Sequence, residues 1–314
     1  MPFKSKLRGG RFRSTVLLLA LIVTGLIPAS RLNAQQDDDV IRVSTELVIL
    51  NITVTNSAGQ YVPGLRLSDF KITEDGREVA LSDITSFSSH ESPFASVILL
   101  DTSGSMEIRL TLARSAAIRF LDQLRPEDVA AVYKFDSKVE QVQEFSGGRD
   151  LAPMAFGLRA RGLTSLHDAI FQASTALADR PEKRKAIVVL SDGMDTQSKA
   201  SADKALESAL AIGASIYAVD MSALEGRNAA ANRQSAMMLK NFADKSGGRF
   251  VETPGGPALR EAFANIAEEL GHQYTVAFRP INRTRDGKWR KLDVKIARED
   301  LIVRTRKAYK APKG

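Results

Sequence analysis

After Pro93 the sequence alternates regularly between short apolar segments and amphipathic segments, and this alternation is what most constrains the fold. The apolar segments predict buried strands at 97–100, 129–135, 186–190 and 215–219. Elsewhere apolar residues recur every three or four positions, which predicts helices near 106–124, 166–177, 202–212, 236–245 and 257–270. Strands that are apolar on both faces are typical of a sheet covered by helices on both sides. The sequence therefore predicts an α/β fold with a doubly wound, mostly parallel sheet flanked by helices.

A β pattern precedes and follows this α/β region. Residues 47–54 are rich in β-branched side chains, and the turn at 74–76 predicts a hairpin whose second strand runs over 79–84. Further strands are predicted at 274–278, 289–297 and 301–309. About 50 residues of strand bury only a small core by themselves. We therefore expect the two β segments to pack together as a small all-β domain, with the α/β domain inserted between them.

The N-terminus has the pattern of a secretory signal peptide. Five basic residues precede a mostly apolar run of 14 residues at 16–29, and the chain becomes polar after Ala34. That run is short for a membrane span. We expect cleavage after Ala34, where the composition becomes polar, and export to the periplasm, the medium or the cell surface. No membrane span is expected after cleavage. An uncleaved anchor is the alternative. The predicted organisation is a signal peptide at 1–34, a β segment at 35–92, the α/β domain at 93–271 and a basic β segment at 272–314.

The positive charge of the chain lies at its two ends. Of the 44 Lys and Arg residues, six lie in 1–34 and 13 lie in 279–314, where only four acids occur. In the strand expected at 289–297, charged and apolar residues alternate, so much of the C-terminal excess is expected on a solvent-facing strand surface. Docking of this segment to acidic surface polymers is the alternative. Few aromatic residues accompany these cations, so a nucleic-acid partner is not expected.

Carboxyl and hydroxyl side chains follow two of the predicted strands and begin one predicted helix. They are Asp101, Ser103 and Ser105 after strand 97–100, Asp192 after strand 186–190, and Thr164 before helix 166–177. Ligands collect at the carboxyl ends of the strands in an open α/β sheet, so we expect these side chains to converge. Two carboxylates and three hydroxyls suit a hard divalent cation, and this mixture favours Mg²⁺, with Mn²⁺ or Ca²⁺ as alternatives. With so few anionic ligands, the ion would gain from one more carboxylate supplied by another molecule.

Together these residues resemble the metal-ion-dependent adhesion site (MIDAS) of von Willebrand factor type A domains. The resemblance rests on Asp101-Thr-Ser-Gly-Ser105, Thr164 and Ser191-Asp192-Gly193, and it covers about residues 94–271. It implies a cation that is coordinated, directly or through water, by Asp101, Ser103, Ser105, Thr164 and Asp192. The flanking β segments are similar in arrangement to integrin β subunits, in which a type A domain is inserted into a β-sandwich.

The resemblance implies a binding module and not an enzyme. In this interpretation the protein is of a bacterial exported type, and a protein partner completes the coordination of the cation with an Asp or Glu carboxylate. A metal-independent structural scaffold is the rival hypothesis. A metal-assisted hydrolase is less favoured because no candidate general base stands out. The identity of the partner and the oligomeric state do not follow from the sequence.

Several other site classes are excluded by what the sequence lacks. The chain has no Cys, so disulfides, thiolate zinc sites and a cysteine nucleophile are impossible. A hydrolase triad of Ser103 or Ser105 with His167 and Asp192 is disfavoured because no Gly-x-Ser-x-Gly elbow occurs. His167 is expected on a helix surface because Mg²⁺ prefers oxygen ligands. Asp195 is expected to be a solvated turn acid, with a position in the outer shell of the cation as the alternative.

Overall fold

The computed structural model of the chain describes residues 47–89, 92–148, 157–192, 195–222, 229–252 and 256–314. The expected signal peptide at 1–34 therefore lies outside the described residues. Residues 41–314 form one compact unit. Of the helices in the described ranges, none combines the length and the apolar character needed to cross a membrane.

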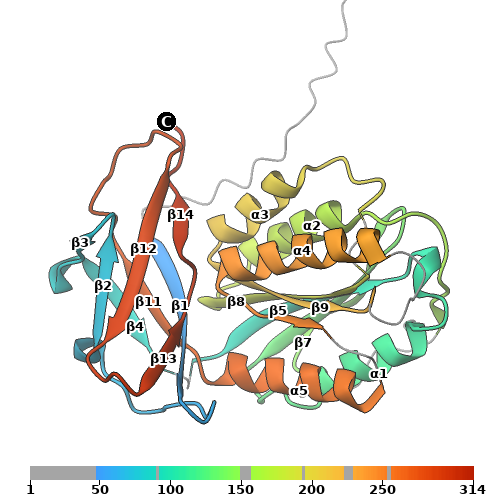
Figure 1. Ribbon diagram of the computed structural model, residues 1–314, viewed down its shortest axis with the longest axis horizontal. Helices are drawn as coiled ribbons and strands as arrows, with labels where there is room; N and C mark the ends of the chain where they lie inside the picture. The colour runs from blue at the N-terminus through green and yellow to red at the C-terminus, as the bar shows by residue number, and fades with distance from the viewer. Residues whose placement is uncertain (1–46, 90–91, 149–156, 193–194, 223–228, 253–255) are drawn as a thin grey trace, which may run out of the picture. The chain divides into compact units, whose positions relative to one another are not determined.

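The middle of the chain forms a six-stranded sheet (Figure 1). Its strands are β5 (Phe94–Asp101), β6 (Val129–Phe135), β7 (Val139–Ser146), β8 (Arg184–Ser191), β9 (Ala214–Asp220) and β10 (Phe250–Glu252). They lie in the order β10-β9-β8-β5-β6-β7, and neighbouring strands are parallel except β6 and β7. The chain winds from β5 first to one edge and then to the other. The predicted doubly wound, mostly parallel sheet is confirmed.

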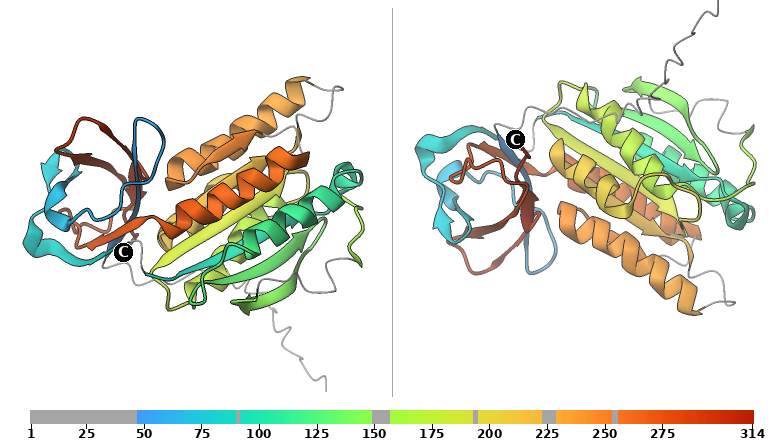
Figure 2. Two further views of the ribbon diagram at one scale, coloured as in Figure 1. Left: turned by 90° about the horizontal axis from the view of Figure 1, so that it is seen from below. Right: turned by 90° about the horizontal axis from the view of Figure 1, so that it is seen from above.

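Helices cover both faces of this sheet (Figures 1 and 2). One face carries α1 (Leu110–Leu121) and α5 (Gly256–Gly271), and the other carries α2 (Leu166–Ala178), α3 (Ala202–Ala211) and α4 (Ala229–Ser246). The apolar side chains of β5 alternate between the two layers, since Ile98 and Leu100 pack with α1 and α5 whereas Val97 and Leu99 pack with the other three helices. Burial on both faces explains why this strand reads as a continuous apolar run.

Some boundaries differ from the predicted ones. The helix expected at 106–124 begins only at Leu110, after a 3-10 turn at Gly104–Met106. Helix α4 begins at Ala229, before the expected start at 236. Strands β7 and β10 have no counterpart among the predicted strands. In β7 only Val142 is buried, because this strand lies at the edge of the sheet, so the apolar pattern that marks a strand is weak there.

The N-terminal and C-terminal segments form two four-stranded sheets around one common core. The first has the order β13-β1-β11-β4, and its strands are β1 (Val48–Asn56), β4 (Ile84–Ser88), β11 (Tyr274–Phe278) and β13 (Leu301–Arg304). The second has the order β14-β12-β2-β3, and its strands are β2 (Phe70–Glu74), β3 (Arg77–Glu78), β12 (Trp289–Ile296) and β14 (Ala308–Lys310). The predicted small all-β domain, built from both flanks of the α/β region, is confirmed.

The predictions for two β elements are wrong in detail. The predicted hairpin forms, since β3 pairs with β2 and the N–H of Val79 donates to Ile72 O (2.9 Å). Its second strand does not continue to 84, because the chain turns through a 3-10 helix at Leu81–Asp83 and enters the other sheet as β4. The strand expected at 301–309 is divided between β13 and β14, which belong to different sheets. Thr305 and Arg306, which lie between these two strands, are buried.

Three arginines of the C-terminal segment point inward, so the prediction that its charge faces solvent is only partly correct. Lys291 and Lys295 on β12 are exposed as expected, but Arg290 and Arg306 are buried. Arg306 donates from Nη1 to the carbonyl oxygen of Leu210 (2.9 Å), and Arg304 donates from Nη1 to that of Gly248 (2.9 Å). Part of the basic excess therefore joins the β domain to the α/β domain.

Candidate metal centre

The three segments expected to carry metal ligands meet at one edge of the sheet. β5 and β8 are parallel neighbours with Leu100 opposite Leu190, so both strands deliver their C-terminal residues to the same place. The segment before α2 joins them through two backbone hydrogen bonds, from Gly104 N to Gly162 O (3.2 Å) and from Arg161 N to Thr102 O (2.8 Å). The convergence expected from the topology is therefore present.

Asp101, the last residue of β5, is fully buried. Its Oδ1 accepts a hydrogen bond from the backbone N–H of Ser103 (2.8 Å), and its Oδ2 accepts one from the hydroxyl of Ser191 (2.5 Å). Burial, and then the charge of Asp192, raise the pKa of Asp101 to about 7, although these hydrogen bonds act in the opposite direction. An ionised carboxylate at this position is therefore costly unless a cation compensates it.

Asp192 follows β8 and is also buried. Its Oδ2 lies 3.7 Å from Nη1 of the buried Arg109, whereas its Oδ1 is buried without a hydrogen-bond partner among the described residues. Buried carboxylate oxygens are normally hydrogen-bonded or bound to a cation. The unpartnered Oδ1 beside a second buried carboxylate fits a site for a divalent cation.

The candidate hydroxyl ligands are held at different depths. Ser103 is buried and Ser105 is exposed, and their Oγ atoms are 3.1 Å apart. Thr164 is buried, and its backbone is tied to Thr196: the Thr164 N–H donates to Thr196 Oγ1 (2.9 Å), and the Thr196 N–H donates to Thr164 O (2.9 Å). Within the described ranges, no group of three or more His, Asp or Glu side chains could hold a metal. A cation here would thus depend on two carboxylates and on hydroxyls.

The loop that brings Thr164 to this edge is narrowly constrained. Gly162 has φ +76°, and a Cβ at this position would lie 2.7 Å from Ser137 Oγ. The same hydroxyl oxygen accepts the N–H of Leu163 (3.0 Å), and Ser165 N donates to Asp136 O (2.9 Å). Glycine is required at 162 for both its positive φ and the lack of space.

Two charged residues at this edge were not among the predicted site residues. Arg109 precedes α1, is only 1% exposed and also donates to Ser105 O (3.5 Å). Asp220 ends β9 opposite Ser191, and its carboxylate accepts the N–H and the hydroxyl of Ser222. Burial raises the pKa of Asp220, and the charges of Glu252 and Asp192 add to this effect. The position of Asp220 after a predicted strand was a usable signal, whereas nothing local marks Arg109 as buried.

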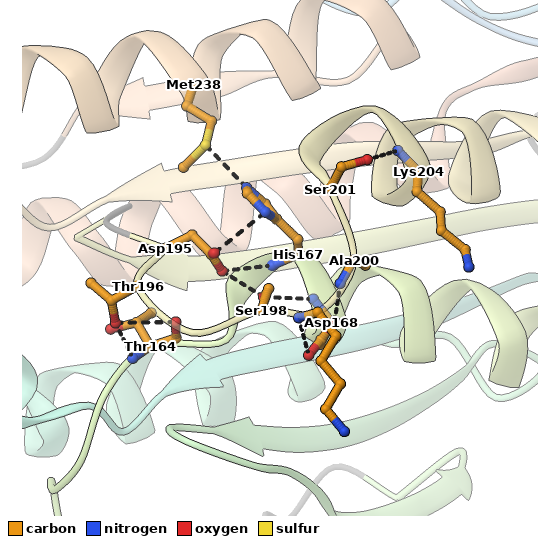
Figure 3. A network of polar contacts seen from close by, with 11 residues as sticks. Thr164, His167, Asp168, Asp195, Thr196, Ser198, Ala200, Ser201, Lys204 and Met238 are labelled. Carbon is orange, nitrogen blue, oxygen red and sulfur yellow. Dashed lines mark hydrogen bonds and ion pairs between the residues drawn. The ribbon is translucent and has the colours of Figure 1, made fainter. Parts of the chain in front are cut away.

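His167 and Asp195 differ from their predicted roles. Their side chains are 13% and 12% exposed, so neither the surface histidine nor the solvated turn acid is correct. Asp195 Oδ1 accepts the backbone N–H of His167 (3.2 Å) and the hydroxyl of Ser198 (2.6 Å), while Oδ2 lies 3.4 Å from His167 Nδ1 (Figure 3). The other ring nitrogen, Nε2, lies 3.2 Å from Met238 Sδ. This network ties the segment after Asp192 to the first turn of α2.

We expect replacement of Asp195 by Ala to destabilise the protein by about 1–2 kcal/mol, because it leaves the N–H of His167 without its acceptor at the start of α2. Chemical denaturation measures the loss. The matched control is Asp203→Ala, which removes an exposed acid from the first turn of α3, where Ser201 Oγ already accepts the N–H of Lys204 (3.1 Å). Equal losses in the two variants would contradict a capping role for Asp195.

The comparison with known families agrees with this geometry. Residues 96–194 match the family model of the von Willebrand factor type A domain, a span that includes all five candidate ligands. No curated protein sequence matches the chain.

Several solved structures are similar to this chain at low sequence identity. The pilus adhesin SpaC from Lactobacillus rhamnosus GG, in an open conformation, has a TM-score of 0.50 at 10% identity, over 82% of this chain and 49% of SpaC. A von Willebrand factor type A protein from Catenulispora acidiphila has a TM-score of 0.47 at 16% identity, over 85% and 73% of the two chains. The PilB minor pilin from Streptococcus sanguinis has a TM-score of 0.45 at 16% identity over 57% of this chain, and the match spans 61% of the pilin.

Proposed function

Because the α/β domain of this chain is a von Willebrand factor type A domain, we propose that it binds a divalent cation, preferably Mg²⁺, and through it a protein partner. The cation would be held by Asp101, Ser103, Ser105, Thr164 and Asp192. An Asp or Glu of the partner would complete its coordination. The protein would then act as an exported, adhesion-type binding module and not as an enzyme.

One observation carries this proposal, namely the pair of buried carboxylates of which one oxygen has no hydrogen-bond partner. Asp192 Oδ1 is buried and has no hydrogen-bond partner among the residues that the structure describes, and burial together with the negative charge of Asp192 makes ionisation of Asp101 unfavourable. Arg109 lies on the Oδ2 side of Asp192, so it does not satisfy Oδ1. A hard divalent cation would satisfy this oxygen and compensate both charges.

The bound ion would supply a Lewis-acidic position for an external carboxylate. The residues of the chain would fix the ligands around that position. The hydrogen bonds from Ser103 and Ser191 hold both oxygens of Asp101, and Gly162 keeps the Thr164 loop close to the turn that follows β5.

The loops around the candidate site expose apolar side chains that suit contact with a protein. Ile108 is 78% exposed, four positions after Gly104, and Leu163 is 53% exposed, directly before Thr164. Because the backbone N–H of Leu163 is bonded to Ser137, this side chain is presented from a fixed loop, which lowers the entropy lost on binding. SpaC, which shares the fold, is a pilus adhesin, and a comparable role for this chain is part of our proposal.

Calorimetric titration of Mg²⁺ and Mn²⁺ into chelator-treated protein tests the proposal. The protein would comprise residues 35–314, which include the complete compact unit 41–314. We expect saturable binding by the wild type and its loss in Asp192→Asn, because the amide cannot replace the anionic ligand. The matched control is Asp203→Asn, which removes one exposed acid from the same domain and should bind as the wild type does.

The outcomes separate the hypotheses. Binding that is lost only in Asp192→Asn supports the cation site and justifies a search for partners in the presence and absence of chelator. No binding by the folded wild type would contradict the proposal and favour a metal-independent scaffold. Equal binding by all three proteins would place the cation elsewhere.

A further inference from the structure

Several exposed cations lie near the only Trp of the chain, either close in sequence or in the C-terminal segment that pairs with it, at one end of the β domain. Trp289 begins β12 and is 46% exposed. Arg285, Lys288, Lys291 and Lys313 are exposed, whereas Lys310, directly opposite Trp289, is paired with Glu207. We call Trp289 and the four exposed cations the tryptophan patch. It lies on the β domain, whereas the candidate metal site lies on the α/β domain.

Backbone contacts hold the parts of the tryptophan patch together. Trp289 pairs with Lys310 across the β12–β14 ladder, and the backbones of Asp286 and Lys313 form an isolated antiparallel β-bridge. The N–H of Gly314 donates to Arg285 O (3.1 Å), so the last residues lie against the turn before β12. Figure 1 shows the C-terminus at the end of the β12 and β14 pair. These cations therefore sit on a fixed surface and not on a free tail.

The positive charge of the patch is only partly compensated within the described part of the protein, because Asp286 and Asp75 lie beside it and accept the backbone N–H groups of Lys288 (3.0 Å) and Lys291 (2.8 Å). The salt bridges there, with N···O distances up to 4.0 Å, include none of the four patch cations. The nearby acids already have other partners. Asp286 binds the buried Arg290 (2.9 Å), and Asp293 lies 3.8 Å from Lys295. Unlike Arg304 and Arg306, the patch cations contribute nothing evident to the junction of the two domains.

We propose that the tryptophan patch binds an anionic phospholipid surface. Lys and Arg side chains near such a surface each contribute about 1 kcal/mol, and they need no shaped pocket. An indole with one side exposed prefers the headgroup region, where its ring is half in water. A nucleic-acid site would stack several aromatic side chains on successive bases, whereas this patch has a single ring. This proposal does not depend on the cation site.

Because Trp289 is the only Trp, its fluorescence reports on the patch alone. Residues 35–314 are titrated with vesicles of phosphatidylglycerol and phosphatidylcholine, and with vesicles of phosphatidylcholine alone. We expect the emission to move to shorter wavelength with the anionic vesicles only, and the effect to weaken as salt is added. Lys288→Gln combined with Lys291→Gln should lower the affinity about tenfold to thirtyfold.

The matched control neutralises two cations that already have carboxylate partners, Lys295→Gln combined with Arg298→Gln. It removes the same charge and should retain most of the affinity. Circular dichroism spectra and thermal unfolding are compared for all variants to exclude misfolding. Equal losses in both double variants would overturn the patch as the binding surface, as would equal binding to neutral vesicles. Binding to soluble dextran sulfate without binding to vesicles would overturn the membrane proposal in favour of an acidic polymer.

Discussion

Asp101→Asn should stabilise the metal-free protein while abolishing its stabilisation by Mg²⁺. The carboxylate of Asp101 is fully buried beside Asp192, and its pKa in the folded protein is raised from 3.8 to about 7. Asn can still accept the N–H of Ser103, and its amide can donate to Ser191. At pH 8 the substitution removes the cost of an ionised buried group, so we expect a gain of about 2 kcal/mol in the free energy of unfolding.

The pH dependence of this difference has a definite sign. A carboxyl whose pKa is raised in the folded state binds its proton more tightly there than in the unfolded chain, so its contribution to stability improves as the pH falls from 8 through 7 toward 3.8. The advantage of Asp101→Asn over the metal-free wild type should therefore shrink at pH 5. Denaturant titrations in chelator at the two pH values measure both differences.

Mg²⁺ should make the wild type more stable than Asp101→Asn, which reverses their order of stability in chelator. A cation at 100 times its Kd adds about 2.7 kcal/mol to the stability of a protein that binds it only when folded. We expect this gain in the wild type and not in Asp101→Asn. If Asp101→Asn is less stable than the wild type in chelator at pH 8, the charges of Asp101 and Asp192 are already compensated without metal.

The second large effect is expected at the junction between the two domains, where Glu269 is buried. The carboxylate of this α5 residue pairs with the guanidinium of Arg304 on β13 and accepts the hydroxyls of Thr53 (3.2 Å) and Tyr217 (2.7 Å). Burial, and then the nearby charge of Glu269, raise the pKa of Tyr217 well above its usual value, so its hydroxyl stays protonated and donates. Arg304→Met leaves the buried charge of Glu269 with only the half-exposed Arg249, at 3.9 Å, as an ion-pair partner in the described part of the chain. We expect a loss of about 3 kcal/mol, and a Tm lower by about 6–12 °C.

The matched control is Arg298→Met, which breaks an ion pair with Asp300 of 2.9 Å in which both side chains are more than half exposed. Exposed ion pairs contribute little to stability, so its Tm should change little. Scanning calorimetry compares the two variants. Glu269→Gln added to Arg304→Met should recover part of the loss, because the buried charge is removed together with its partner. Similar Tm values for Arg304→Met and Arg298→Met would contradict a structural role for the buried pair.

The periodic pattern of apolar residues was enough to predict the class of the fold and most of its helices and strands, but not β7 and β10. The continuous apolar strand at 97–100 indicated a sheet buried on both faces, and the alternation of Lys291, Leu292 and Asp293 indicated a strand with one exposed face. Such patterns are readable because burial repeats with the period of the element. Four of the five candidate ligands follow predicted strands and Thr164 precedes a predicted helix, and whether they bind a cation stays a prediction.

The partners of the buried charged and polar side chains could be identified from the folded structure alone. Charged residues are usually expected at the surface, so nothing in the sequence marks these as buried partners. The structure pairs Arg109 with Asp192 and Glu269 with Arg304, and it places Asp195 at the start of α2. The division of the strand expected at 301–309 between two sheets has the same origin, since Arg304 and Arg306 bind carbonyl groups far away along the chain. Polar contacts between distant segments leave no local period. They depend on which surfaces meet when the chain folds, so the sequence pattern could not reveal them.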